Sequence, residues 1–590
     1  MPRERPGTPV ATAKGAYDSL NAMNTLKGKA RLKTDNTAGD GQPGAGRPRG
    51  QRSDPQARAE LRALLGEAPR RRDLLLEFLH RVQDRYGCIS SAHMVALAEE
   101  LKLAPVEVYE VASFYHHFDL VPVGEKGSPR TTVRVCQSLS CAMAGARELL
   151  QTIARREGVR VIAAPCVGRC AGAPVAVVGR NAIEHATADA VHDAIAGGAV
   201  EANLPEHIDY AQYRAGGGYR CLEALLADLR RGEQVIGSLE ASGLRGLGGA
   251  GFPAARKWRS VAAEAAPRLM VVNIDEGEPG TFKDRHYLER DPHRCLEGML
   301  IAAASVGIAE IFIYLRDEYA GCREILARAL AELTADPPCA LPPMHLRRGA
   351  GAYICGEESA LIESLEGKRG LPRLRPPYVA QRGLFGRPTL VHNLETLYWL
   401  RDIVERGGEW WAKQGRHGQD GRGLRSYSVS GRVNSPGVVL APAGISVREL
   451  IAECCGGMQE GHTLYAYLPG GASGGILPAS LADLPLTAEG LAAHGAHIGS
   501  AAIIVLSQQD SARDACANLM HFFADESCGQ CTPCRVGTAK AAQLVQARRW
   551  DRPLLEDLAK VMMDASICGL GQAAPNPLLS VMRYFRHEIE

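Results

Sequence analysis

Two groups of cysteines have the number and spacing that suit iron–sulfur chemistry. Near the C-terminus, Cys528, Cys531 and Cys534 form a C-x2-C-x2-C run, and Cys568 follows as a distant fourth thiol. Near residue 150, a pair separated by four residues is followed by a pair separated by three, namely Cys136, Cys141, Cys166 and Cys170. Four thiolates per group are the ligand count of one iron–sulfur cluster. The sequence therefore predicts two clusters and a role in electron transfer.

Structural zinc is the alternative interpretation of these groups. Zinc sites usually consist of two C-x2-C pairs. Three cysteines spaced by two, with a fourth far away, are typical of the ligands of a [4Fe–4S] cluster. We therefore expect a [4Fe–4S] cluster on the C-terminal group, and the wider spacing of the Cys136 group favours a binuclear [2Fe–2S] cluster.

A glycine-rich loop, Gly246–Gly251, satisfies the pattern G-x-G-x-x-G. The pattern alone is weak, because the dinucleotide-binding fingerprint requires a strand directly before it. Residues 222–239 have helical periodicity instead, so we reject a standard Rossmann motif. The glycine amides still suit a close approach to a phosphate or a flat ring, with Lys257 as a nearby cation. A simple tight turn is the alternative.

Two further segments place acidic side chains where α/β proteins bind ligands. The segment Asn273–Asp284 follows an apolar stretch that predicts a buried strand. Glu357 and Glu358 open a predicted helix after a run of small residues. A solvated acidic loop, or the preference of carboxylates for a helix N-terminus, is the alternative explanation. Both segments suit hydrogen bonds to a ribose or to ring amide groups, and Arg375 and Tyr378 beyond them suit a lid over a phosphate and a ring.

The elements that position these motifs predict a multidomain chain of the α/β and α+β classes. At 590 residues the chain is too long for one core. Alternating strands and helices between residues 269 and 348 argue for a largely parallel sheet covered by helices. The predicted parts are a disordered basic tail (1–54), with an arm that docks on a partner as the alternative, a helical bundle (55–125), a small α/β unit (126–200), a larger α/β domain (201–420), a small β-rich domain (421–508) and a C-terminal helical bundle that holds the second cysteine group (509–590).

Composition narrows the functional classes. A net charge of +2 gives no reason to expect nucleic acid or an anionic membrane as the partner. No apolar run reaches the ~20 residues that span a bilayer, and the N-terminus lacks the apolar core of a secretory signal. The 17 cysteines are an odd number, which favours a reducing compartment over a disulfide framework. We therefore expect a cytoplasmic protein.

Taken together, these motifs make residues 219–590 similar to the FMN- and NADH-binding flavoprotein subunit of respiratory complex I. The resemblance rests on long segments, namely 245–258, 273–284, 349–358, 367–377 and 526–535. Residues 56–200 resemble the thioredoxin-like [2Fe–2S] subunit with its N-terminal helical bundle. The resemblance therefore implies a thioredoxin-like domain, an FMN-binding α/β domain, a small β-grasp-like (ubiquitin-like) domain and a C-terminal helical bundle with a [4Fe–4S] cluster.

The fusion of the two parts resembles the β subunit, or diaphorase, of NAD-dependent molybdenum or tungsten formate dehydrogenases. Details such as Trp410-Trp411 and the segment 467–476 carry this finer likeness. The diaphorase subunit of an NAD-reducing nickel–iron hydrogenase and the NADH-input module of complex I are the alternatives. A zinc-bound structural scaffold is the alternative from a different class.

The resemblance implies a set of cofactor-binding residues. FMN is implied to lie on Gly246, Gly248, Gly249, Lys257, Asn273, Asp275, Glu276, Tyr353, Gly356, Glu357 and Asn393, with Arg245 in the same motif. The nicotinamide nucleotide is implied to lie near Phe252, Glu278, Glu358, Arg375 and Tyr378. His392 replaces the first Asn of the family's Asn-Asn-x-Glu-Thr pattern. Arg375 and Tyr378 stand where Lys and Phe are common, which puts adenine-side affinity in doubt.

The implied chemistry is reversible hydride exchange between NAD(H) and FMN. A flavin exchanges both paired and single electrons, so it belongs between a hydride carrier and the clusters. No side chain is needed as a general acid or base, and Glu276 and Glu358 are expected only to position the reactants. The implied partner is a large molybdopterin-type formate dehydrogenase subunit, with Mo or W and further iron–sulfur clusters, in a hetero-oligomer.

Overall fold

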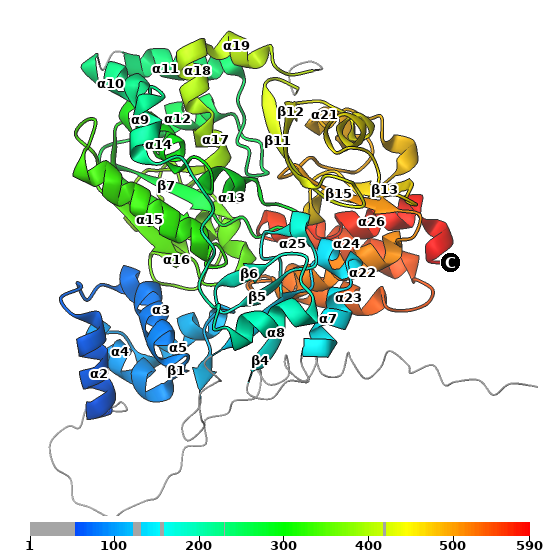
Figure 1. Cartoon of the computed structure of the whole chain (residues 1–590), viewed down its shortest axis with the longest axis horizontal. Helices are drawn as coiled ribbons and strands as arrows, with labels where there is room; N and C mark the ends of the chain where they lie inside the picture. The colour runs from blue at the N-terminus through cyan, green and yellow to red at the C-terminus, as the bar shows by residue number, and fades with distance from the viewer. Residues whose placement is uncertain (1–52, 122–130, 154–158, 229–230, 417–420) are drawn as a thin grey trace, which may run out of the picture. The chain divides into compact units, whose positions relative to one another are not determined.

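The computed structural model of the protein describes residues 53–121, 131–153, 159–228, 231–416 and 421–590 (Figure 1). The predicted basic tail lies outside these residues except for its last two. One of them, Asp54, caps the first helix by accepting a hydrogen bond from the Ala57 amide at 2.8 Å. Within the described ranges, no helix combines the length and the apolar character that a membrane crossing requires.

The first helices form the predicted bundle around fully buried leucines such as Leu61, Leu79 and Leu97. Two short parallel strands close it. Its elements are α2 (Pro55–Leu65), η1 (Arg72–Leu74), α3 (Leu75–Tyr86), β1 (Ile89–Ser90), α4 (Ser91–Leu101), α5 (Pro105–Phe114) and β2 (Leu120–Val121).

A small mixed sheet follows, in the order β4-β3-β5-β6, with only β3 and β4 parallel. Val133 and Val135 of the central strand share one apolar core with α7 and α8, which Figure 1 shows beside the sheet. This is the predicted thioredoxin-like fold. Its elements are β3 (Thr132–Cys136), α6 (Leu139–Met143), α7 (Ala146–Ile153), β4 (Arg160–Ala164), η2 (Cys170–Gly172), β5 (Ala176–Val178), β6 (Asn181–Ile183) and α8 (Ala188–Ala196).

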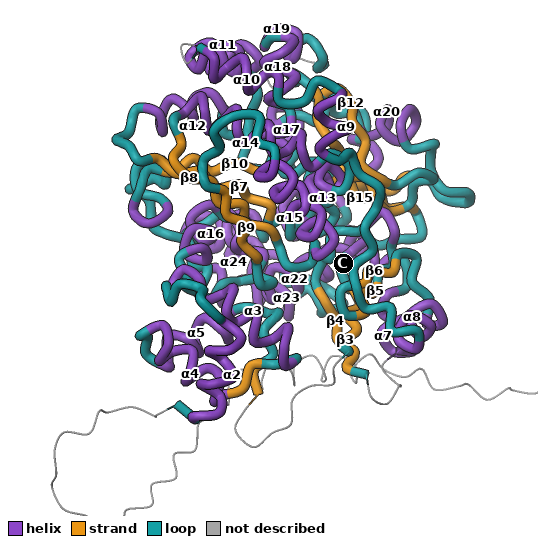
Figure 2. The backbone as a smooth tube through the Cα atoms, turned by 60° about the vertical axis from the view of Figure 1, so that its left-hand side comes forward, coloured by secondary structure: helices purple, strands orange, loops and turns teal. Residues whose placement is uncertain are grey.

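The middle of the chain contains a four-stranded sheet, β10-β7-β8-β9, in which all strands run parallel, as predicted (Figure 2). Along β7, Met270 and Val272 enter one apolar core while Leu269 and Val271 enter another. Both faces are therefore covered, which is usual for parallel sheets. The strands are β7 (Arg268–Ile274), β8 (Ile308–Leu315), β9 (Met344–Arg348) and β10 (Thr389–Asn393).

Helices surround this sheet and connect its strands. Because the carboxyl ends of parallel strands meet at one edge, the segments that follow β7, β8, β9 and β10 gather there. The helices are α9 (Tyr210–Ala215), α10 (Arg220–Ala227), α11 (Arg231–Ser242), α12 (Ala254–Ala262), α13 (Lys283–Leu288), α14 (Pro292–Val306), α15 (Ala320–Ala335), η3 (Tyr353–Gly356), α16 (Glu358–Leu365), η4 (Leu384–Gly386), α17 (Leu394–Tyr398), α18 (Leu400–Arg406) and α19 (Gly408–Ala412).

A third sheet, β12-β11-β15-β13-β14, forms the predicted small β-rich part. Alternate residues of β15 enter two cores, with Ile503 and Val505 on one side and Ile504 and Leu506 against the C-terminal helices. The elements are β11 (Leu424–Gly431), β12 (Gly437–Pro442), α20 (Val447–Glu449), the π-helical turn η5 (Leu450–Cys454), β13 (Leu464–Leu468), η6 (Ala472–Gly474), β14 (Leu477–Pro478), η7 (Ala479–Leu481), α21 (Ala488–Ala492) and β15 (Ala502–Ser507).

The chain ends in the predicted helical bundle, whose α22 packs against α23 and α26. Leu519, Met520 and Phe523 of α22 are fully buried in it. The elements are α22 (Ala512–Asp525), α23 (Thr532–Leu544), α24 (Arg552–Ala565), α25 (Gly569–Ala573), α26 (Asn576–Tyr584) and η8 (Arg586–Glu588).

Candidate functional site

The carboxyl edge of the parallel sheet joins the loops that follow β7 and β9. The Asn273 side-chain amide donates to Gly356 O at 2.8 Å, and its Oδ1 accepts from the Asp275 amide at 3.0 Å. A Cβ on Gly277 would lie 3.1 Å from the ring of Tyr353, so the two loops are in direct contact. This edge therefore brings together Asn273, Asp275, Tyr353 and Gly356, which the sequence predicts to bind FMN.

The glycine-rich loop between α11 and α12 lies against the end of β10. The Leu247 amide donates to Thr396 Oγ1 at 2.9 Å, and a Cβ on Gly248 would lie 2.9 Å from Asn393 Cβ. Gly249 has a φ of +124°, which favours glycine. Both glycines are exposed, so their backbone is open to a ligand. A helix precedes the loop, which confirms that this is not a standard Rossmann motif.

A network of opposite charges connects the glycine-rich loop to the segment after α16. Lys257 Nζ lies 3.4 Å from Glu358 Oε2 and donates to a carbonyl of β10 at 3.0 Å. Glu358 Oε1 lies 3.1 Å from Arg375 Nη2, and Arg375 also contacts Glu357. Glu357 Oε2 caps α16 by accepting from two amides of its first turn at 3.0 and 2.9 Å. Predicted flavin and nucleotide residues thus share one network.

Three other predicted residues lie on the open side of this edge. The side chains of Phe252 and Tyr378 are 42% and 55% exposed, as expected of rings available for stacking on a ligand. Arg245 Nε donates to Gly251 O at 2.6 Å and so closes the glycine-rich loop.

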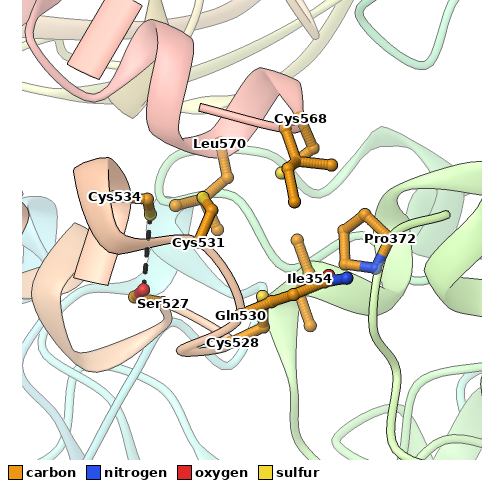
Figure 3. A pocket seen from close by; sticks show the side chains of 10 residues that line it. Ile354, Pro372, Ser527, Cys528, Gln530, Cys531, Cys534, Cys568 and Leu570 are labelled. Carbon is orange, nitrogen blue, oxygen red and sulfur yellow. Dashed lines mark hydrogen bonds between the residues drawn. The ribbon is translucent and has the colours of Figure 1, made fainter. Parts of the chain in front are cut away.

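The C-terminal cysteine group lines one cavity (Figure 3). Cys531 and Cys568 are the N-cap residues of α23 and α25, where the helix dipole favours a thiolate. Ser527 Oγ lies 3.3 Å from Cys534 Sγ. Figure 3 shows Cys568 facing the other three cysteines, with side chains of the parallel-sheet domain on a further side. The lining residues are Cys528, Cys531, Cys534, Cys568, Ser527, Gln530, Ile354, Pro372, Ile567 and Leu570.

The N-terminal cysteine group is buried at the ends of the thioredoxin-like strands. Cys136 ends β3, Cys141 lies in α6, Cys166 follows β4 and Cys170 opens η2. Each is at most 3% exposed. The sulfur atoms of Cys166 and Cys170 lie 3.4 Å apart, and contacts with the thiols of Cys136 and Cys170 lower the pKa of Cys166 well below its usual range. The structure therefore assembles this group as well.

The C-terminal cavity adjoins the predicted flavin site through one loop. Ile354 lies between Tyr353 and Gly356 in sequence, and its side chain lines the cavity. The Tyr353 amide donates to Glu526 Oε2 at 2.9 Å, two residues before Cys528. The loop after β9 therefore contacts the sheet edge on one side and the cysteine cavity on the other.

The N-terminal group adjoins the same edge through the loops after β7 and β8. Phe282 packs with Cys166 and Cys170 in one buried cluster. Arg316, which is 4% exposed, donates to Cys166 O at 2.6 Å and also to Glu276 O. Both cysteine groups thus lie beside the loops that carry the predicted flavin residues.

Comparison with known proteins identifies the family. An F-type NADH-quinone oxidoreductase chain of Rhizobium meliloti, the second of its kind in that organism, is 38% identical over 401 residues, 65% of this chain and 94% of the relative. This chain belongs to the complex I 51 kDa flavoprotein family. Another member, the mitochondrial NADH-ubiquinone oxidoreductase 51 kDa subunit of Neurospora crassa, is 41% identical over 383 residues, 61% of this chain and 77% of the relative.

The regions of likeness cover both cysteine groups. Family models match as the Nuo51 FMN-binding domain (239–402), a thioredoxin-like [2Fe–2S] ferredoxin (61–198), the NADH-ubiquinone oxidoreductase-F iron–sulfur binding region (514–590) and an SLBB domain (426–477). A chain in the crystal structure of an air-oxidized NAD+-reducing [NiFe]-hydrogenase superposes with a TM-score of 0.76 at 31% identity, covering 89% of this chain and 95% of that chain. The fused arrangement therefore has a solved relative.

These matches confirm the cofactor set of FMN, NAD(H), [4Fe–4S] and [2Fe–2S], and the residues fit it. Each cysteine group offers four thiols, and the matched iron–sulfur regions favour clusters over zinc. At the sheet edge, Asp275 Oδ2 is buried without a hydrogen-bond partner among the described residues. Burial raises the pKa of this carboxyl well above its usual range, so it suits a hydrogen bond to a polar atom of a ring.

Two predicted acidic residues of this flavoprotein bind other parts of the chain. Glu276 accepts from the amides of Asp284 and Arg285 at 2.9 and 3.2 Å, and burial raises its pKa to about 7. Glu278 accepts from Ser473 N and Ser500 Oγ at 2.9 and 3.0 Å, which ties the loop after β7 to the β-rich domain. Their roles toward FMN and the nucleotide stay predictions.

The sequence analysis did not single out several residues that shape the site. Ile354 and Arg316 connect the sheet edge to the two cysteine groups, and no local pattern marks either. His392, noted only as a departure from the family pattern, has a clear place. It is buried, its pKa is lowered well below the usual range by burial, and its Nε2 accepts from the Trp258 indole at 2.8 Å.

Proposed function

We propose that the protein is the NAD(H)–FMN oxidoreductase, or diaphorase, subunit of an NAD-dependent formate dehydrogenase. It takes electrons from a molybdopterin-type partner subunit through iron–sulfur clusters and passes them to NAD+ as hydride, reversibly. When bound, FMN supplies the exchange between a hydride and single electrons. The supporting family members act in NADH oxidation by name.

One observation carries this proposal. The loop after β9 presents Tyr353, Gly356 and Glu357 to the sheet edge and presents Ile354 to the cysteine cavity. A ring held at the sheet edge and a cluster held by the thiols would share this short loop. The thioredoxin-like group lies against the loops on another side of the same edge.

The proposed roles of the side chains follow from their contacts. Exposed amides of the glycine-rich loop and the cation of Lys257 suit a phosphate. Glu358 lies between Lys257 and Arg375 and is placed to orient the nucleotide, while Phe252 and Tyr378 offer rings for stacking. These residues bind and orient; none is required to transfer a proton in hydride exchange.

The hydrogenase diaphorase is the second candidate function. The likeness to the NAD+-reducing [NiFe]-hydrogenase chain spans 89% of this protein, which includes both cysteine groups. The formate dehydrogenase assignment rests on the sequence resemblance, including Trp410-Trp411 and the segment 467–476. The two candidates share every cofactor of this subunit and differ only in the partner.

Isolation of the native complex through a tag on this chain distinguishes them. The complex is assayed for NAD+ reduction with formate and, separately, with hydrogen, and its Mo, W and Ni contents are measured. Formate activity with Mo or W supports the proposal, and hydrogen activity with Ni establishes the second candidate instead. A complex that oxidises NADH with a quinone alone would identify an input module of complex I.

A further inference from the structure

A fully buried ion-pair cluster lies directly behind the sheet edge. Lys283 Nζ lies 3.0 Å from Asp284 Oδ1 and 3.0 Å from Glu395 Oε2, and the three side chains are only 2%, 5% and 1% exposed. Burial of charged groups is costly unless they are paired and hydrogen-bonded. An arrangement this deeply buried therefore requires a lysine at this position rather than another helix-forming residue.

The cluster holds a residue of the predicted flavin site. The carboxylate of Asp284 accepts two hydrogen bonds from Asn393 Nδ2, at 3.1 and 3.0 Å, and one from the Glu395 amide at 3.2 Å. Asn393 ends β10 and lies against Gly248 of the glycine-rich loop. The ammonium of Lys283 thus fixes Asp284, and Asp284 fixes the side chain on which the glycine-rich loop rests.

The same cluster connects two sheets. Glu395 Oε1 accepts from the Ser426 amide at 3.1 Å, at the start of β11 in the β-rich domain. Glu276 caps α13 through the amides of Asp284 and Arg285. Lys283 is therefore the ammonium that faces the carboxylates of Asp284, Glu395 and Glu276. Without it, these carboxylates would repel one another in surroundings of low dielectric.

We propose that Lys283 is a positioning residue of the flavin site, which holds Asn393 through Asp284 and offsets the negative charge behind the sheet edge. The inference rests on the proposed function only in taking this edge as the flavin site. A ring that accepts electrons becomes more negative, so nearby charge tunes its potential. Removing the ammonium should therefore weaken FMN binding and make the flavin harder to reduce.

The test uses the full chain with Lys283→Met, which keeps a long apolar side chain and removes the charge. We expect FMN affinity to fall about tenfold. We also expect the ratio of affinities for reduced and oxidised flavin to fall at least tenfold, which lowers the two-electron midpoint potential by about 30 mV. The exposed Lys413→Met in the same domain is the matched control and should change neither quantity. The visible and EPR spectra of the clusters report whether the rest of the chain is intact.

The double variant Lys283→Met/Glu395→Gln separates charge from position. It restores the net charge of the cluster, so the midpoint potential should return toward wild type while FMN affinity stays low. A purely structural role would leave the potential of the double variant as low as that of Lys283→Met, which would overturn the electrostatic part of the proposal.

Two single variants keep the inference testable if Lys283→Met does not fold. Lys283→Arg retains the charge and should keep the potential close to wild type, whereas Glu395→Gln removes one negative charge and should raise it. An unchanged or lowered potential in Glu395→Gln would overturn the inference. Wild-type chain that binds no FMN would refute the proposed function itself, whereas wild-type flavin binding that Lys283→Met leaves unchanged would refute only the role of Lys283.

Discussion

Replacing Gly248 with alanine tests whether the glycine-rich loop and the end of β10 fit each other closely. The added Cβ would lie 2.9 Å from Asn393 Cβ and 3.5 Å from Asn393 Cγ. The first distance is shorter than a normal carbon–carbon contact, so the loop or Asn393 must move. Overpacking of this kind typically costs about 1–3 kcal/mol. We expect about 2 kcal/mol here, because Gly248 is exposed and the loop has room to give way on its open side.

The first measurement is thermal unfolding of the chain without flavin. A loss of about 2 kcal/mol lowers Tm by about 4–8 °C for a domain of 150–250 residues. The second is FMN binding, followed by quenching of flavin fluorescence. Displacement of Asn393 should weaken FMN about tenfold, which corresponds to about 1.4 kcal/mol. Iron content should not change, because Gly248 contacts neither cysteine group.

Gly246→Ala is the matched control for stability. Its Cβ would meet Phe252 O at 3.6 Å, an ordinary contact, and Gly246 does not have a positive φ. The Tm of the flavin-free chain should therefore stay within a degree or so of wild type. Equal losses of Tm in the two variants, or a Gly248→Ala chain with wild-type Tm and FMN affinity, would refute the argument from close packing.

Three further predictions test the site. Glu358→Ala, which breaks the contacts with Lys257 and Arg375, should raise the KM for NADH about tenfold with iron content intact; loss of iron would show that the loop is misplaced. Cys531→Ala should still allow NADH to bleach the flavin but should stop electron delivery to the partner, and unchanged activity of the whole complex would contradict this path. Burial raises the pKa of Glu276 from 4.5 to about 7, so the folded protein binds this proton more tightly and loses stability as pH rises from about 4.5 to about 7. Glu276→Gln should flatten that fall by up to about 3 kcal/mol, as measured by urea unfolding at several pH values, and an unchanged slope would show that Glu276 does not titrate in this range.

The parallel sheet could be predicted for β7, β8 and β9 but not for β10. The first three are apolar runs of five to eight residues that alternate with helices, which is the pattern of a buried parallel strand. The strand Thr389–Asn393 is short, contains a histidine and an asparagine, and follows irregular chain. Its place comes from main-chain pairing with β7, which no local sequence pattern reveals.

The cysteine ligands could be predicted from spacing, whereas the neighbours that connect them to the sheet could not. Thiol spacing reflects the cluster itself, and so it is visible in one dimension. Ile354, Phe282 and Arg316 act through contacts across the fold, and each would suit an ordinary core or surface position by residue type. The same limit applies to Lys283, whose importance depends on burial beside Asp284 and Glu395.

The two cysteine groups differ in access to solvent, and this difference suggests a division of roles. The thiols of the N-terminal group are all buried and enclosed on one side by the flavin loops. Cys528, Cys531 and Cys568 are partly exposed, and Val536, two residues beyond Cys534, is 53% exposed on α23. Among the described residues, an outside electron carrier therefore approaches the C-terminal group more closely. We infer that this cluster exchanges electrons with the partner subunit, while the N-terminal cluster exchanges them only with the flavin site.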